Sequence, residues 1–314
     1  MNIPSTAAAD ETDEDRTRNG LIAALIAYTT WGFMPIYFKI VSAVPAAEVL
    51  AHRIVWAVPF GALIVALRRQ WPEVKRALGE RRTFGFLALA AVFIAINWFG
   101  YILAVQSGNI FQASLGYYIN PLMYVAIGVW FLHERLRTPQ TLAVALAAIG
   151  VAVLTVSGGQ FPVIALTLAT SFTIYGVIRS QIAIGGMPGL FIETLVLFPL
   201  AGGYMGWLMV RGASAFGTHD PGMAGLLLLA GPLTAVPLLF FALAARRLRL
   251  STIGILQFIA PTLQFLMGLA YGEQLTVPRA ICFSLIWIAV VVFSVDAWRA
   301  NRLKTTVAVQ PSVQ

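Results

Sequence analysis

The amino-acid sequence predicts an all-α integral membrane protein in which ten transmembrane helices form two inverted five-helix repeats. Three observations predict this fold: a very apolar composition, ten apolar stretches, and a weak similarity between the two halves of the chain. Of the 314 residues, 59% are hydrophobic and 11% are charged, and the mean hydropathy is +0.81. Soluble domains carry about 25% charged residues, so this chain has too few charges to cover a soluble protein. The net charge of +8 therefore indicates no nucleic-acid partner, and the expected surroundings are membrane lipid.

Each predicted helix is a continuous apolar stretch of about the 20 residues that a helix needs to cross a bilayer. The stretches lack the two-residue alternation of membrane β-barrel strands. The polar segments at residues 1–19 and 300–314 are expected to be disordered cytoplasmic tails, and the first lacks the basic start and early apolar core of a signal peptide. The ten helices are expected at residues 21–41, 47–67, 84–105, 111–132, 139–157, 162–179, 189–210, 223–244, 252–271 and 278–298.

Basic residues indicate the orientation, because Lys and Arg concentrate on the side of the membrane from which chains are not translocated. With a cytoplasmic N-terminus, seventeen of the 21 basic residues lie on the cytoplasmic side, and the exceptions are Lys39, Arg53, Arg211 and Arg279. We therefore expect a multi-pass protein of the cell (inner) membrane with both termini in the cytoplasm.

The two halves of the chain match at an offset of about 140 residues. The segment Tyr118–Pro121 corresponds to Phe258–Pro261, and Glu134–Leu136 corresponds, after a one-residue slip, to Glu273–Leu275. Repeats are expected at residues 20–158 and 159–299. Five helices are an odd number, so the second repeat enters the membrane from the opposite side. Inverted repeats are typical of secondary transporters, whose halves meet at a substrate site near the membrane midplane.

Several short runs carry a resemblance to a known family over about residues 18–300. They are Tyr37–Lys39, His52–Arg53, Asn97–Trp98, Ala113–Pro121, His133–Arg135, Ile192–Thr194 and Arg247–Thr252, of which Ala113–Pro121 and Arg247–Thr252 are the most specific. The chain resembles the RarD group of the EamA family, in the drug/metabolite transporter superfamily, although His133 stands where a glycine is more typical. This resemblance implies ten helices in two EamA-like repeats and the export of small metabolites or drugs.

Ionisable side chains at membrane depth are candidate functional groups, because each costs at least about 2.5–3.5 kcal/mol on insertion scales. Lys39 and Glu48 are expected near the outer end of the pathway, and Arg179 and Glu193 near the inner end. We expect them to gate the pathway or to take up a proton at a buried carboxylate. The alternative is that Lys39–Glu48 and Arg179–Glu193 are static ion pairs.

His52 and Arg53 are expected to line the substrate pathway. Glu48 and His52 are four residues apart, so the two side chains can touch on one helix face. A guanidinium such as that of Arg53 is suited to grasp a carboxylate or a phosphate.

Neutral polar groups and prolines complete the predicted site. The prolines Pro121 and Pro261 each remove a backbone hydrogen bond and are expected to be hinges or helix breaks. The polarity of the predicted pocket suggests an amphipathic zwitterion, such as an amino-acid derivative, as the substrate. The remaining pathway residues are Asn97, Tyr117, Tyr118, Asn120 and Gln257, for which hydrogen bonds between helices are the alternative role.

Pairs of glycines spaced four residues apart permit helices to approach closely. We expect Gly185–Gly189, Gly202–Gly206 and Gly268–Gly272 to pack within the bundle of a monomer, with a homodimer as the alternative.

Motifs of other functional classes are missing from the sequence. It contains no phosphate-binding Gly-x-x-x-x-Gly-Lys-Ser/Thr run, no His-Glu-x-x-His and no Gly-x-Ser-x-Gly, and Cys282 is its single cysteine. Two ligands, Glu48 and His52, are too few to indicate a metal site. No cofactor, no metal and no catalytic residue is therefore expected.

These observations predict a secondary transporter rather than an enzyme. It is expected to export a small metabolite or drug-like solute by alternating access, driven by the proton gradient or by the gradient of the substrate itself. One alternative is an intramembrane enzyme that acts on a lipid or isoprenoid phosphate through Glu48, His52 and Arg53. The other alternative is a passive channel or a transport-related sensor.

Overall fold

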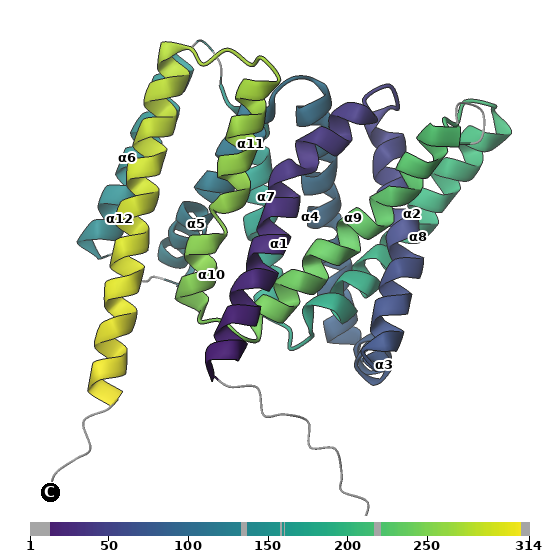
Figure 1. The fold of residues 1–314 in the computed structure, drawn as a ribbon, viewed down its shortest axis with the longest axis horizontal. Helices are drawn as coiled ribbons and strands as arrows, with labels where there is room; N and C mark the ends of the chain where they lie inside the picture. The colour runs from purple at the N-terminus through teal and green to yellow at the C-terminus, as the bar shows by residue number, and fades with distance from the viewer. Residues whose placement is uncertain (1–12, 133–136, 158, 160, 217–220, 309–314) are drawn as a thin grey trace, which may run out of the picture.

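The computed structural model describes residues 13–132, 137–157, 159, 161–216 and 221–308, and every regular element in them is a helix (Figure 1). The predicted all-α class is therefore confirmed. The helices are α1 (Asp13–Ile40), α2 (Ala46–Leu67), α3 (Trp71–Gly79), α4 (Arg81–Gln106), α5 (Ile110–Leu132), α6 (Thr138–Val156), α7 (Val163–Ser180), α8 (Gly186–Val210), α9 (Pro221–Ala245), α10 (Leu250–Leu256), α11 (Ile259–Ala270) and α12 (Val277–Ala308).

Within the described residues, nine stretches are helical, long and apolar enough to cross a membrane, and α10 with α11 counts as one of them. The 23-residue helix α5 occupies the remaining predicted span. Each of the ten apolar stretches found in the sequence is thus helical. Their order along the chain places the start of α1 and the end of α12 at the same face of the bundle, at the bottom of Figure 1. We call this face the terminal face and the other the opposite face.

Three parts of the chain differ from the sequence prediction. Helix α1 begins at Asp13 and α12 continues to Ala308, so both helices run into the segments predicted as tails, of which residues 1–12 and 309–314 lie outside the described residues. Outside lipid a helix tolerates charge, and an ion pair of 2.8 Å joins Arg18 to Asp15 one turn earlier. The link between α2 and α4 contains the short helix α3, which buries Val74 and places polar residues outward. The predicted match at Glu134–Leu136 lies outside the described residues.

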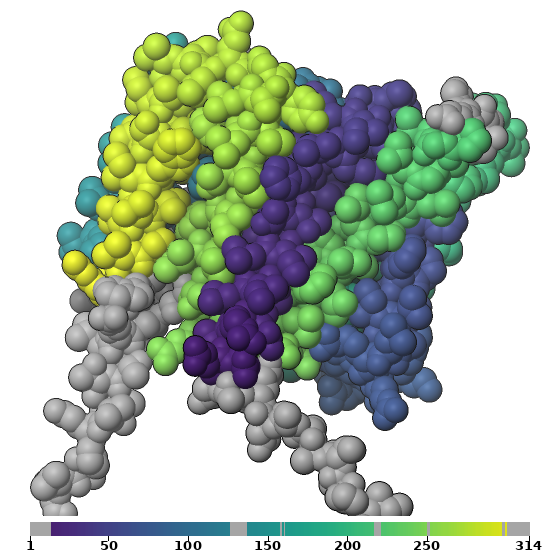
Figure 2. All heavy atoms as spheres, in the orientation of Figure 1, coloured from purple at the N-terminus to yellow at the C-terminus, as the bar shows by residue number. Residues whose placement is uncertain are grey.

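Helix packing relates the two halves to each other. Helix α1 packs against α9 and α11, and α7 packs against α4 and α5, which is the same arrangement with the halves exchanged. Three further contacts join corresponding helices, α2 with α8, α5 with α11, and α6 with α12. Figure 2 shows α1 lying between α11 and α9 with side chains filling this face of the molecule. Each half therefore packs mainly against the other, and the two halves share one interior.

Two glycines bring helices of opposite halves close together. A Cβ atom on Gly116 of α5 would lie 2.8 Å from the carbonyl oxygen of Ala165 in α7, and one on Gly231 of α9 would lie 2.5 Å from that of Trp56 in α2. Any larger residue would push these helices apart. The packing role predicted for Gly202–Gly206 is wrong, because no neighbouring atom lies within 4 Å of a Cβ on Gly206. These two glycines lie on the outer surface of α8, where no other helix of the described chain approaches them.

Candidate functional site

Arg53 of α2 lies in the interior between the two halves, with only 7% of its surface exposed. Its guanidinium carbon lies 4.3 Å from the centre of the Trp98 ring on α4, an arrangement that favours a cation–π interaction. Its Nε donates a hydrogen bond of 2.9 Å to the hydroxyl oxygen of Thr234 on α9. Helices of both halves therefore hold this one cation.

Asn97 of α4 forms the neighbouring part of the site. Its amide nitrogen donates to the carbonyl oxygen of Leu168 at 3.0 Å and to the hydroxyl oxygen of Ser171 at 3.2 Å, both on α7. Its amide oxygen accepts a hydrogen bond of 3.1 Å from the Tyr117 hydroxyl on α5. We call Arg53, Asn97, Trp98, Tyr117 and Thr234 the central cluster.

The phenol rings around Arg53 complete the lining of the central cluster. Tyr37, Tyr101 and Tyr117 lie close enough to interact with the guanidinium electrostatically. The ring centres of Tyr101 and Tyr117 are 5.6 Å apart. The hydroxyl of Tyr101 is buried and forms no hydrogen bond within the described part of the chain. The site thus combines one cation with aromatic and neutral polar groups.

A second polar group lies nearer the opposite face. Glu48 accepts hydrogen bonds from the Ser214 hydroxyl at 2.9 Å and from the backbone N–H of Ala215 at 2.7 Å. His52 lies beside Glu48, with 3.9 Å between Nε2 and the carboxylate, and its Nδ1 accepts a hydrogen bond from Trp56. The predicted contact between Glu48 and His52 is therefore present, but both side chains point away from the central cluster toward the segment that follows α8.

The predicted pairing of Lys39 with Glu48 does not occur. The Lys39 ammonium instead lies 5.8 Å from the centre of the Tyr271 ring, beyond the end of α11. The hydrogen bonds from Ser214 and Ala215 already occupy one carboxylate oxygen of Glu48, and the side chain is buried. Lys39, at the end of α1, therefore lies outside the contact between Glu48 and the segment after α8.

A third polar group lies toward the terminal face, where Arg179 and Glu193 form an ion pair of 3.4 Å. The Tyr175 hydroxyl donates to the other carboxylate oxygen of Glu193 at 3.2 Å, and Arg179 also donates to the carbonyl oxygen of Gly185 at 3.3 Å. Glu193 is fully buried, whereas the Arg179 side chain is 15% exposed. The pairing of Arg179 with Glu193 that the sequence suggested is present.

Three residues predicted to line the pathway form their hydrogen bonds with residues outside the central cluster. The Tyr118 hydroxyl bonds to that of Thr262 on α11 at 2.7 Å. The amide of Asn120, oriented to donate, reaches the carbonyl oxygen of Ala169 at 3.2 Å. Gln257 donates to the carbonyl oxygen of Gly254, three residues earlier. These side chains connect helices or brace one turn, which is the alternative role that the sequence left open.

The two prolines behave differently from each other. Helix α5 continues through Pro121, so Pro121 does not break the helix, and a hinge there stays a prediction. A proline in a membrane helix is tolerated where neighbouring groups satisfy the backbone that it frees. The predicted span that contains Pro261 does break, at Gln257–Phe258, just before this proline. Pro261 thus lies in the first turn of α11, where a missing N–H costs little, and its carbonyl oxygen accepts a hydrogen bond from Ser114.

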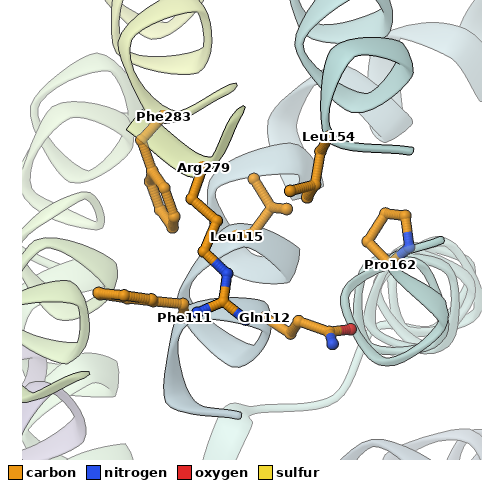
Figure 3. Close-up of a pocket in the computed structure, with 7 residues that line it drawn as sticks. All are labelled: Phe111, Gln112, Leu115, Leu154, Pro162, Arg279 and Phe283. Atoms are coloured by element: carbon orange, nitrogen blue, oxygen red, sulfur yellow. The ribbon is translucent and has the colours of Figure 1, made fainter. Parts of the chain in front are cut away.

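A small pocket near the opposite face contains none of the predicted site residues (Figure 3). The Arg279 side chain points into it and donates to the carbonyl oxygen of Gln274 at 2.8 Å. Nearby, Glu273 accepts hydrogen bonds from the backbone N–H groups of Ile110 and Phe111 at the start of α5. Burial raises the pKa of Glu273, and these hydrogen bonds oppose the shift. The pocket is lined by Phe111, Gln112, Leu115, Leu154, Pro162, Arg279 and Phe283.

Sequence reasoning missed several residues of the site. Thr234 and Ser171 provide partners for Arg53 and Asn97, and Ser214 holds Glu48. A Ser or Thr in an apolar helix is inconspicuous because its hydroxyl can bond to its own helix, as Thr234 does to the carbonyl oxygen of Ala230 at 2.8 Å. No pattern in the sequence distinguishes them from other small polar residues.

Comparison with known proteins identifies the family. The EamA-like transporter family matches residues 18–156. An uncharacterized transporter of Vibrio cholerae is 44% identical over 92% of this chain and 96% of its own length. The protein RarD of Salmonella typhi is 43% identical over 93% of this chain and all of its own length. This chain belongs to the EamA-like transporter family.

Within this family the chain falls in the RarD group of the drug/metabolite transporter superfamily, as the resemblance in the sequence implied. The protein RarD of Escherichia coli is 42% identical over 92% of this chain and 98% of its own length. A crystal structure with 17% sequence identity shares the fold, with a TM-score of 0.59 over 88% of this chain and 97% of that one. The chain is therefore a multi-pass membrane transporter of this superfamily.

Proposed function

We propose that this protein is a secondary transporter of the cell (inner) membrane that exports a small metabolite or drug-like solute by alternating access. The central cluster carries the proposal, because α2, α4 and α5 of the first half and α7 and α9 of the second half meet there through buried polar groups. A small movement of one half against the other would uncover these groups toward one face or the other. The proposed partners are a small-molecule substrate and the surrounding lipid, for a monomer or a homodimer.

The proposed orientation places the terminal face in the cytoplasm. Arg16 donates to the carbonyl oxygen of Arg246 at this face. Burial lowers the pKa of Arg68, and the nearby guanidinium groups of Arg246 and Arg247 lower it further. Such a concentration of positive charge is typical of a cytoplasmic face. A reporter enzyme that works only in the cytoplasm should be active when it is fused after residue 314, and a reporter that works only outside the cytoplasm should be inactive there. The reverse result would invert the proposed orientation.

For the coupling ion we propose the proton, bound at Glu193. Its carboxylate is fully buried against one arginine and one phenol, so a change in its protonation would alter a contact between α7 and α8. In proteoliposomes, Glu193→Gln should remove the dependence of transport on an imposed pH gradient. Transport by Glu193→Gln that remains driven by that gradient would exclude Glu193 as the coupling site.

Alternating access can be tested before any substrate is known. Ser171 touches the Asn97 amide at 3.2 Å and is 4% exposed, so Ser171→Cys in a Cys282→Ala background places a nearly isosteric probe at the central cluster. A membrane-impermeant thiol reagent should label this cysteine from either side of sealed vesicles. The wild-type protein is the matched control, because its Cys282, on α12, is buried against α6 and should stay unlabelled.

The outcomes of this experiment separate the proposed transporter from its alternatives. Labelling from one side only would contradict alternating access. It would favour the alternative of an intramembrane enzyme whose site opens to one face of the membrane. Passage of the reagent through the protein into sealed vesicles would indicate a channel. Labelling from both sides of vesicles that exclude the reagent supports the transporter.

A further inference from the structure

Arg53 is a buried cation without a counter-charge. Its Nε donates to Thr234, and it forms no ion pair within the described part of the chain. Removing a charge from water is costly unless the charge is paired, and a buried charge without a partner is correspondingly unfavourable. The terminal nitrogens of Arg53 remain available as a forked pair of donors, which matches the geometry of a carboxylate or a phosphate.

The carboxylates nearest in the fold are engaged elsewhere. Glu48, on the same helix as Arg53, is held by Ser214 and Ala215 near the opposite face. Glu193, on α8, is paired with Arg179 toward the terminal face. The other groups around Arg53 are an indole, a phenyl ring, phenols and a hydroxyl, all neutral. The central cluster therefore carries a net positive charge.

Aromatic rings surround this charge. Trp98 lies against one face of the guanidinium at 4.3 Å, and Phe38 lies at 5.9 Å. Tyr101 contacts Phe38 with 5.8 Å between ring centres, and Tyr117 contacts Phe172 of α7 at 6.0 Å. Flat apolar surfaces next to a cation favour a ligand that has an anionic end and a flat apolar body.

From this geometry we propose that the transported substrate is an organic anion with a planar apolar part. Its carboxylate or phosphate accepts hydrogen bonds from the terminal nitrogens of Arg53, whose Nε remains bound to Thr234. Its planar part lies against Tyr101 and Tyr117. The proposal rests on the proposed transport function and names the substrate class for the same site. It replaces the zwitterion suggested by the sequence, because an added ammonium group would meet no carboxylate here, and the indole face that favours a cation already holds Arg53.

A matched series of probes tests this assignment. We would measure binding to the purified full-length protein in detergent through the increase in its melting temperature with ligand concentration. The probes are 3-phenylpropionate, phenyl phosphate, the neutral 3-phenylpropanamide and the zwitterion phenylalanine. We expect the amide and the zwitterion to bind about tenfold or more weakly than the better of the two anions, the effect of one charge-assisted hydrogen bond. The ratio between 3-phenylpropionate and phenyl phosphate identifies which anionic group the site takes.

Variants assign the selectivity to Arg53. Arg53→Gln should bind anion and amide equally. Arg53→Lys keeps the charge and should retain part of the preference for the anion, and it provides the test if Arg53→Gln fails to fold. Arg211→Gln is the matched control, because Arg211 lies 4.5 Å from the Trp207 ring but is exposed at the end of α8. It should leave the preference unchanged.

Three results would overturn the proposal: equal binding of amide and anion by the wild type, an anion preference that survives in Arg53→Gln, or no binding by any of the four probes at about 10 mM, a concentration well above the micromolar to millimolar affinities usual for small ligands. None of these results would disprove transport itself. The labelling of Ser171→Cys from both sides is independent of the charge of the substrate, so the two proposals fail separately.

Discussion

The two buried carboxylates on corresponding helices, Glu48 on α2 and Glu193 on α8, have different kinds of partner. Glu48 accepts from a hydroxyl and a backbone N–H and holds the segment after α8. Glu193 faces a guanidinium and a phenol and joins α7 to α8. Corresponding helices of the two halves therefore do not have equal chemistry. The contact of Glu48 requires a hydrogen-bond acceptor, whereas the contact of Glu193 requires two opposite charges.

The largest effect that distinguishes the two contacts is expected from Arg179→Gln. This change leaves Glu193 as a buried charge without its cation, and breaking a buried ion pair on one side costs about 3–5 kcal/mol. We expect a marked fall in the melting temperature of the protein in detergent. The double variant Arg179→Gln, Glu193→Gln should recover much of the loss, because no charge is then left unpaired. A double variant as unstable as the single one would show that the ion pair is not the cause.

A smaller effect is expected at Glu48, where the partners are neutral. Glu48→Ala leaves the backbone N–H of Ala215 without its acceptor and should cost about 1–3 kcal/mol of stability. Glu48→Gln keeps an oxygen acceptor in the same place and should cost less than Glu48→Ala. The same thermal measurement ranks them, and a Glu48→Gln variant as unstable as Arg179→Gln would mean that the Glu48 contact also depends on charge.

The smallest effect concerns a third carboxylate, Glu273, which lies outside the membrane-spanning segments. Burial raises the pKa of Glu273, so ionising it costs more in the folded protein than in the unfolded chain. Its contribution to stability is complete below the ordinary pKa of 4.5 and is lost as the pH rises through the raised value. Thermal unfolding across pH should therefore show that Glu273→Gln loses less stability than the wild type as the pH rises above 4.5. Parallel pH profiles would contradict this assignment.

The sequence predicts the membrane passes well because apolar composition and length decide them. The ten predicted spans differ from the helices mainly at their ends, where Asp13 and Ala308 extend helices beyond the lipid. Helix α3 was missed because nine residues with few buried positions do not produce a long apolar stretch. Hydrophobicity measures contact with lipid, and it carries little information about helices that lie outside the membrane.

The candidate site can be predicted from the sequence only in part, because an ionisable residue in an apolar segment is conspicuous, whereas the direction of a neutral side chain is not. Arg53 and Asn97 were found by their polarity in an apolar surrounding. The adjacent residues Tyr117 and Tyr118 were assigned to one pathway, yet consecutive positions on a helix point about 100° apart. Tyr117 accordingly faces Asn97, and Tyr118 faces Thr262 on α11. Only the packing of α5 between α7 and α11 decides this difference.

The break between α10 and α11 bears on how the protein is made. Helices of seven and twelve residues are each shorter than the roughly 20 residues that cross a bilayer. Non-helical backbone at that depth is tolerated only where protein covers it, and both segments pack against α1. The ninth pass therefore needs the first as a neighbour, although the ribosome completes them more than 200 residues apart. We expect that biogenesis keeps α1 accessible until late in synthesis, so that the last helices complete a bundle begun by the first.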